Sequence, residues 1–369
     1  MHRTSTCAIL PILLLFSLAA CTPAPVPTAT ASPTLAPASQ TAAPSLLPSL
    51  TQAPATATET RPPSPTGPPT ETATPDPYAL YTIDTLASRE YGGGSIEIVE
   101  VMAETGWFTR YLIRYPSDGL WIYGFLNVPI PEGPAGPGPY PVVIALHGYI
   151  DPSIYHTLDY TTGYADALAR AGYFVLHPNL RGYRPSDDGE NLFRVGMAID
   201  VLNLIALVQA GAAESWLLAN VDTAMIGLWG HSMGGGISTR VITVTDRVQA
   251  AVLYAPMSGD ERQNFEAING WSGGARGLEE LAFPERELAR ISPMYFFDRI
   301  TAAVSIHHGR ADELVPLGWS IATCNAMLEL DLDVRCHYYD AMPHTFFGAG
   351  NDQLIADMIA FFDETLKEE

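Results

Sequence analysis

The chain has 369 residues, 47% of them hydrophobic, and a formal net charge of −21 at pH 7. This length can hold two average domains, although one α/β domain often uses about 250 residues or more. An exterior this acidic, in a chain with a single lysine (Lys367), repels nucleic acid, so we expect no nucleic-acid partner. An ordinary acidic surface accounts for the charge.

Residues 1–20 have the pattern of a signal peptide. A short basic start precedes an apolar run that is too short to span a membrane. The run ends in Leu-Ala-Ala-Cys, which resembles the bacterial lipoprotein box, whose cysteine (here Cys21) becomes the lipid-bearing N-terminus. A secretory signal cut after Ala20 is the alternative. Several acyl chains on Cys21 predict stable anchoring to the membrane of the cell envelope, outside the cytoplasm.

Residues 21–77 continue from that cysteine into a segment made almost entirely of Pro, Thr, Ala and Ser. Because it has no apolar periodicity, it cannot bury a core, and we expect a disordered linker. The folded domain is therefore predicted to span residues 78–369.

Within that domain, apolar runs typical of strands alternate with helical patterns. We expect strands at residues 96–101, 108–115, 120–128, 142–146, 173–177, 225–229, 250–254, 303–307 and 334–339. We expect helices at residues 164–171, 196–210, 233–241, 317–330 and 353–366. The turn at residues 116–119 joins two of the first strands into a hairpin. The pattern predicts an α/β fold with antiparallel N-terminal strands and a mostly parallel central sheet covered by helices on both faces.

Residues 257–292 interrupt this alternation. They contain Trp271, closely spaced glycines and many charges, but no clear strand. Long segments without regular structure are uncommon inside compact domains unless they are functional. We therefore expect a small cap insertion here, with a long surface loop as the alternative.

Ser232 is the predicted nucleophile. It stands in Gly-His-Ser-Met-Gly, between an apolar strand and a helix. A sharp strand-to-helix turn exposes the serine, and small neighbours let the backbone pass closely. The helix N-terminus favours the negative charge that develops in acyl transfer.

A serine needs a base that a carboxylate orients, and in folds with this turn the order is serine, acid, histidine. His344 follows the last strand in a loop and is our base; His307, His308 and His337 lie in or at the end of strands. Asp312 lies in the loop after residues 303–307 and is our acid, with Glu313 and Asp340 as competitors.

The oxyanion of acyl transfer needs hydrogen-bond donors. The backbone N–H of Met233 is one, because it follows the nucleophile. The second is expected from the loop after residues 142–146, where Tyr149 offers its N–H, its hydroxyl or both. His147 in the same loop is interpreted as structural, because it precedes the serine.

Cys324 and Cys336 are the cysteines left in the folded domain. They fall on a predicted helix and the following strand, so they pair only if these elements are neighbours; two buried thiols are the alternative. The scattered histidines and the absence of H-E-x-x-H or C-x-x-C spacing predict no metal site. No glycine-rich phosphate loop is present, and we expect no cofactor.

Several motifs together resemble the catalytic domain of prolyl-oligopeptidase-like serine hydrolases, which have the α/β-hydrolase fold. They lie at residues 114–119, 141–148, 179–182, 308–316 and 343–344. The resemblance implies the triad Ser232, Asp312 and His344. Some members of that family use a tyrosine hydroxyl at the position of Tyr149 for the oxyanion.

Two features differ from the peptidases of that family. About 36 folded residues precede Arg114, too few for the β-propeller that those peptidases carry. The nucleophile motif Gly-His-Ser-Met-Gly-Gly-Gly is more similar to dienelactone-hydrolase-like esterases, lipases and cutinases. We therefore expect hydrolysis of a small carboxylic ester, with a peptidase acting on short peptides as the alternative. A surface protein that only binds is a third hypothesis, which the ordered triad disfavours.

Overall fold

The computed structural model describes residues 76–211 and 216–367. The predicted signal peptide, Cys21 and most of the predicted linker lie outside these residues. All nine predicted strands are present. They are β1 (Glu97–Glu104), β2 (Phe108–Ser117), β3 (Leu120–Pro129), β4 (Tyr140–Leu146), β5 (Phe174–Pro178), β6 (Val221–His231), β7 (Ala250–Tyr254), β8 (Ala303–Gly309) and β9 (Val334–Tyr339).

The strands form one sheet in the order β1-β2-β3-β5-β4-β6-β7-β8-β9. The pairs β1–β2, β2–β3 and β3–β5 are antiparallel, and every pair from β5–β4 to β8–β9 is parallel. This confirms the predicted α/β-hydrolase fold. Because the carboxyl ends of the parallel strands meet at one edge, the loops after β4, β6, β8 and β9 come together there.

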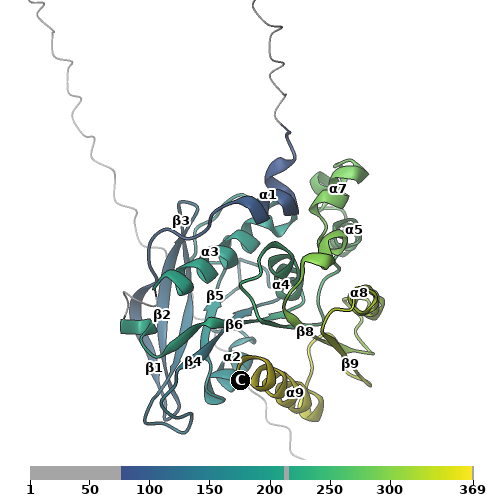
Figure 1. Cartoon of the computed structure of the whole chain (residues 1–369). Helices are drawn as coiled ribbons and strands as arrows, with labels where there is room; N and C mark the ends of the chain where they lie inside the picture. Colours follow the sequence, from purple (N-terminus) through teal and green to yellow (C-terminus); the bar gives the residue numbers. More distant parts are fainter. Residues whose placement is uncertain (1–75, 212–215, 368–369) are drawn as a thin grey trace, which may run out of the picture. The chain divides into compact units, whose positions relative to one another are not determined.

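Helices cover both faces of the sheet (Figure 1). The helices are α1 (Ile83–Ser88), α2 (Thr162–Arg170), α3 (Val195–Gly211), α4 (Met233–Val244), α5 (Glu261–Trp271), α6 (Leu278–Leu281), α7 (Glu285–Ile291), α8 (Leu317–Glu329) and α9 (Gly348–Leu366). Short 3₁₀ turns are η1 (Ala79–Tyr81), η2 (Leu192–Arg194), η3 (Trp216–Leu218) and η4 (Pro293–Arg299).

Alternate side chains of the buried strands belong to two hydrophobic cores. In β4, Val142 and Ile144 pack with α3 and α4, whereas Val143 and Ala145 pack with α2 and α9. This period of two follows from strand geometry and explains why β4 is apolar throughout.

The segment Leu192–Gly211 is the one helical stretch among the described residues that is long and apolar enough to cross a membrane, but 83% of its most apolar window is buried in the fold. This burial is typical of a core helix rather than of a membrane span.

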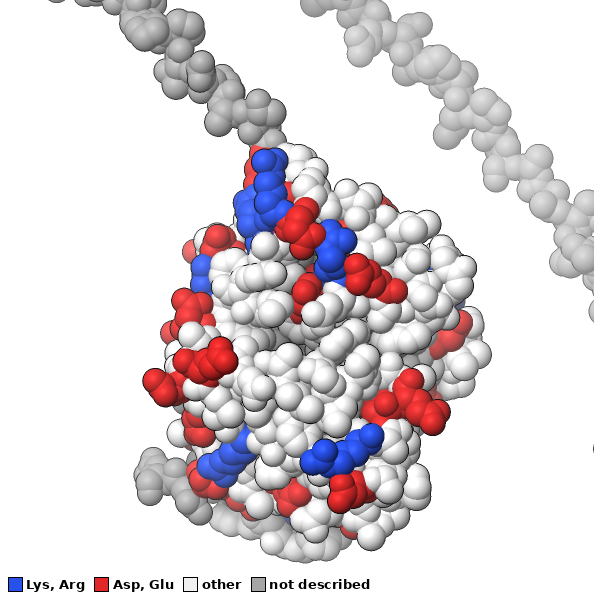
Figure 2. Space-filling model, turned by 90° about the vertical axis from the view of Figure 1, so that its right-hand side faces the viewer, with Lys and Arg blue, Asp and Glu red and all other residues white. Residues whose placement is uncertain are grey.

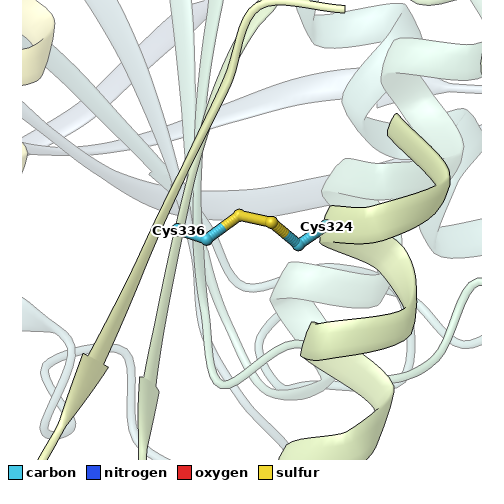
Figure 3. Close-up of a disulfide and its surroundings, with 2 residues drawn as sticks. All are labelled: Cys324 and Cys336. Atoms are coloured by element: carbon cyan, nitrogen blue, oxygen red, sulfur yellow. A yellow bond between two sulfur atoms is a disulfide. The ribbon is translucent and has the colours of Figure 1, made fainter. Parts of the chain in front are cut away.

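The disulfide hypothesis is confirmed in the structure. Cys324 of α8 and Cys336 of β9 are bonded, with their sulfur atoms 2.02 Å apart (Figure 3). The bond attaches a covering helix to the edge strand of the sheet.

The segment 257–292 contains no strand and holds the three short helices α5, α6 and α7. A buried ionic cluster attaches its first helix to α4. The Glu261 carboxylate accepts hydrogen bonds from Arg240 of α4 at 2.5 Å and from Arg194 at 2.6 Å. The side chains of Glu261 and Arg240 are 4% and 2% exposed. This cluster fixes the first helix of the segment 257–292, the predicted cap, to the helix that follows Ser232.

The surface carries basic as well as acidic side chains. On the face shown in Figure 2, acidic and basic side chains lie around a broad uncharged area. This agrees with an ordinary, mixed exterior.

Glu261→Ala should destabilise the domain by about 3–5 kcal/mol, because it leaves two largely buried guanidinium groups without their carboxylate. Urea unfolding followed by circular dichroism measures this change. Glu266→Ala is the matched control on the same helix, since Glu266 is 60% exposed and lies 3.9 Å from Arg262. Equal unfolding midpoints for the two variants would show that the buried cluster adds no stability.

Candidate active site

Ser232 occupies the sharp turn between β6 and α4, with φ of 55° and ψ of −113°. A residue with a side chain rarely adopts this backbone conformation, and such strain is typical of nucleophile turns. The neighbouring glycines are required by space. A Cβ atom on Gly230 or on Gly234 would lie 2.3 Å from a backbone oxygen. The predicted turn is therefore formed, and its sequence pattern has a steric cause.

Two groups border Ser232. Met233 is the first residue of α4, so its N–H has no partner within the helix and is free to donate. The loop after β4 also lies close to Ser232: a Cβ atom on Gly148 would lie 3.2 Å from the Cβ of Ser232. Tyr149, the next residue in that loop, is thereby brought to the edge of the site.

Asp312 and His344 form a hydrogen-bonded pair, with 2.7 Å between Asp312 Oδ2 and His344 Nδ1. The Asp312 side chain is fully buried, and that of His344 is 12% exposed. The other carboxylate oxygen accepts the backbone N–H groups of Leu314 at 2.8 Å and Val315 at 2.9 Å. Because Nδ1 of His344 is held by the carboxylate, Nε2 is the nitrogen left for a substrate or nucleophile.

A second histidine contacts the same carboxylate. His308 Nε2 lies 3.0 Å from Asp312 Oδ2, while its Nδ1 lies 2.7 Å from the Ser320 hydroxyl. Burial raises the pKa of Asp312, but hydrogen bonds from His308, His344 and Val315 outweigh it and hold this pKa well below its usual range. Asp312 is therefore ionised at pH 7.

The loop that carries His344, the predicted base (the base loop), lies beside the turn at Ser232. The ring of His231, the residue before Ser232, is centred 4.7 Å from the ring of His344. The structure thus brings Ser232, Asp312 and His344 to the carboxyl ends of β6, β8 and β9, as their order in the sequence predicts.

Tyr149 is half exposed, and its hydroxyl accepts a hydrogen bond from Arg276. The Arg276 guanidinium also lies over the tyrosine ring, 5.0 Å from its centroid. Since Arg276 lies between α5 and α6, the segment 257–292 extends to the loop after β4.

The competing residues have other partners. Asp340 is 93% exposed and pairs with Arg310. His147 is buried, with its ring nitrogens facing the carbonyl oxygens of Gly148 and Asn179. His307 is also buried and stacks on His337.

Sequence reasoning missed the contacts of His308, His231, Tyr160 and Arg276. His308 and His231 lie inside the motifs for the acid and the nucleophile, which is the signal that could have identified them. Within residues 76–211 and 216–367 there is no group of three or more His, Cys, Asp or Glu side chains arranged to hold a metal ion.

A family model described as serine aminopeptidase, S33, matches residues 137–364, which is more than half of the chain. The chain belongs to this family. It is a serine hydrolase of the α/β-hydrolase superfamily, as its motifs suggest.

Solved structures with the same fold include esterases and peptidases. Acetyl xylan esterase 1 from Thermoanaerobacterium sp. JW/SL YS485 has a TM-score of 0.55 and 19% identity, over 77% of this chain and 92% of the esterase. A puromycin-hydrolyzing peptidase of Mycobacterium tuberculosis has a TM-score of 0.53 and 23% identity, over 70% of this chain and 40% of the peptidase. For acylaminoacyl peptidase from Pyrococcus horikoshii the values are 0.53 and 19%, over 76% of this chain and 51% of the peptidase. The chain therefore spans about half or less of these two peptidases.

Asp312→Asn should lower the free energy of unfolding by roughly 1.5–3 kcal/mol at pH 7, because it replaces an ionised acceptor of four hydrogen bonds. The pKa of Asp312 is lower in the folded than in the unfolded protein. Its stabilisation is therefore complete above the unfolded value of about 3.9 and is lost as the pH falls below it. Urea unfolding from pH 7 to pH 3 measures both proteins. A stability difference that stays constant over this range would contradict the depressed pKa.

Proposed function

We propose that this chain hydrolyses carboxylic esters through an acyl-enzyme, with Ser232 as nucleophile, His344 as base and Asp312 as the carboxylate that orients it. The observation that carries the proposal is the buried Asp312–His344 pair beside the strained turn at Ser232. A binding protein has no use for this arrangement.

In the proposed reaction, Ser232 Oγ attacks the ester carbonyl carbon while His344 Nε2 takes the serine proton. The negative oxygen of the tetrahedral intermediate accepts hydrogen bonds from Met233 N–H and from Tyr149. The intermediate collapses, and His344 returns the proton to the departing alcohol. Water then attacks the acyl-enzyme by the same route, which releases the acid and restores Ser232.

The hydrogen bond from Arg276 determines which group Tyr149 can offer in this reaction. A guanidinium can only donate, so the Tyr149 oxygen is the acceptor and the phenolic proton stays available. Tyr149 can therefore donate its O–H to the oxyanion while Arg276 holds the ring.

An ester is favoured over a peptide by two observations. The nucleophile motif Gly-His-Ser-Met-Gly-Gly-Gly is similar to those of esterases and lipases. The structural match extends over 92% of the acetyl xylan esterase but only 40% of the puromycin-hydrolyzing peptidase. Cleavage of short peptides is the second candidate, and the description of the matching family as serine aminopeptidase favours it.

We also propose that the protein acts outside the cytoplasm, attached to a membrane through a lipid on Cys21. The Leu-Ala-Ala-Cys motif at the end of an apolar run supports this location. The Pro- and Thr-rich segment that follows would then separate the hydrolase from the bilayer.

The purified domain should cleave nitrophenyl esters, and it should not cleave peptide nitroanilides. Amide cleavage is the decisive measurement, because many peptidases also hydrolyse activated esters; efficient anilide cleavage would establish the peptidase alternative.

Ser232→Ala should abolish both ester hydrolysis and labelling by a fluorophosphonate probe, with an unchanged melting temperature as the folding control. Persistent labelling of this variant would eliminate Ser232 as the nucleophile.

Cys21→Ala should move the full-length protein from the membrane fraction of expressing bacteria to the soluble fraction, because it removes the site of the acyl chains. Fractionation and immunoblotting measure the distribution. Cys7→Ala, a change within the predicted signal peptide, is the matched control and should remain in the membrane fraction. Continued membrane association of Cys21→Ala would place the anchor elsewhere in the chain.

A further inference from the structure

Two polar side chains, Tyr160 and His231, connect three loops around Ser232. The backbone N–H of Gly148 donates to the Tyr160 hydroxyl oxygen at 3.0 Å. This hydroxyl lies 2.6 Å from His231 Nδ1, and His231 Nε2 lies 3.0 Å from the carbonyl oxygen of His344. The connection runs from the loop after β4, through the nucleophile turn, to the loop of the base.

The direction of each hydrogen bond in this connection is determined by chemistry. Burial, together with the nearby His344, lowers the pKa of His231 to about 3, so its ring is neutral at pH 7 and carries one proton. The carbonyl oxygen of His344 can only accept, which places this proton on Nε2. Nδ1 must then accept, and Tyr160 is its donor. The Tyr160 oxygen remains free to accept the N–H of Gly148.

His231 also packs against the base loop. Its ring stacks on the buried ring of Tyr254, with 4.2 Å between centroids. The Tyr254 hydroxyl accepts the backbone N–H of Phe346 at 2.6 Å. The base loop is therefore held by its backbone on both sides of residue 345, at the carbonyl of His344 and at the amide of Phe346.

From this geometry we infer that His231 is a positioning residue, which sets the place of His344 relative to Ser232 through its Nε2–H and is itself oriented by Tyr160. The inference rests on the proposed function, in which His344 is the base. His231 is 2% exposed, so it acts without touching the substrate. A displacement of about 1 Å in a catalytic group can cost on the order of 100-fold in rate, which makes such an anchor consequential.

The same connection limits the oxyanion donors. The N–H of Gly148 is engaged by Tyr160 and is not available to a substrate. In the loop after β4, this leaves the donors of Tyr149, the residue already proposed for this role.

Substitutions of His231 by Gln, Asn and Phe distinguish the contribution of Nε2 from that of Nδ1. The amide of Gln reaches the position of Nε2 and can donate to the His344 carbonyl, whereas that of Asn reaches only the position of Nδ1. Phe provides neither group. We expect His231→Gln to retain kcat for a nitrophenyl ester within about 10-fold, and His231→Asn and His231→Phe to lose about 100-fold, with KM little changed. The rate of fluorophosphonate labelling should follow the same order.

Two further variants complete the experiment. His156→Gln, at an exposed histidine of the loop before α2, is the matched control and should equal the wild type. Tyr160→Phe removes the hydroxyl that orients His231 and that accepts the N–H of Gly148, and it should lower kcat roughly 10-fold in a protein that still folds. It decides the question if the His231 variants do not fold, since an unchanged kcat in Tyr160→Phe would overturn the inference.

The other outcomes are also distinct. Equal kcat for the Gln, Asn and Phe variants, or losses that parallel their melting temperatures, would reduce His231 to a packing role. If the wild type shows neither ester hydrolysis nor labelling at Ser232, the proposed function itself fails. If the wild type is active but kcat does not follow the expected order among the variants, the positioning role of His231 is rejected and the proposed function stands.

Discussion

The backbone conformation of Ser232 is the constraint on which the rest of the site depends. A positive φ at a residue with a side chain costs on the order of 1–3 kcal/mol and persists only where its surroundings hold it. Here the N–H of Ser232 donates to the Tyr254 carbonyl at 2.9 Å, and its carbonyl accepts the N–H groups of Gly236 and Met257 at 3.1 Å each. These bonds link β6 to β7, to α4 and to the first residue of the segment 257–292. The strain is thus held by the parallel sheet and by the first residue of the segment 257–292 together.

Buried ionic groups join separate elements of the fold. Glu261 joins the segment 257–292 to α4 through Arg240, and Asp200 of α3 binds Arg181 of the loop after β5 at 2.8 Å. In a chain with 40 acidic and 19 basic side chains, these arginines are used at buried junctions rather than in a surface patch. The bidentate guanidinium suits such positions, because it satisfies a carboxylate and backbone carbonyls at once.

The sheet, and the positions of the proposed triad at the ends of its strands, could be predicted from the sequence because their signals are local. A buried parallel strand such as β4 is a continuous apolar run, and Ser232, Asp312 and His344 each follow a strand in the expected order. β6 begins four residues before its predicted start, because its first residues pair with the beginning of β4, which no local pattern indicates. The tautomer of His231 and the bond from His308 to Asp312 depend on neighbours that only the folded chain brings together. The helices α5, α6 and α7 escaped prediction because they are short, with 11, 4 and 7 residues, and because a glycine-rich stretch separates α5 from α6.

His344, the proposed base, lies between two groups of different charge, and this difference has a chemical consequence. On one side, the ionised Asp312 stabilises the positive charge that His344 acquires in the proposed reaction, when it takes the serine proton. On the other side, the ring of His231 lies 4.7 Å away and must not carry a charge, because two neighbouring imidazolium ions would repel each other. Burial keeps His231 neutral, so it can hold the backbone of His344 without opposing its protonation. A charged side chain with the same reach would fix the loop equally well and would weaken the base. A buried neutral histidine is therefore suited to this position in a way that lysine or arginine is not.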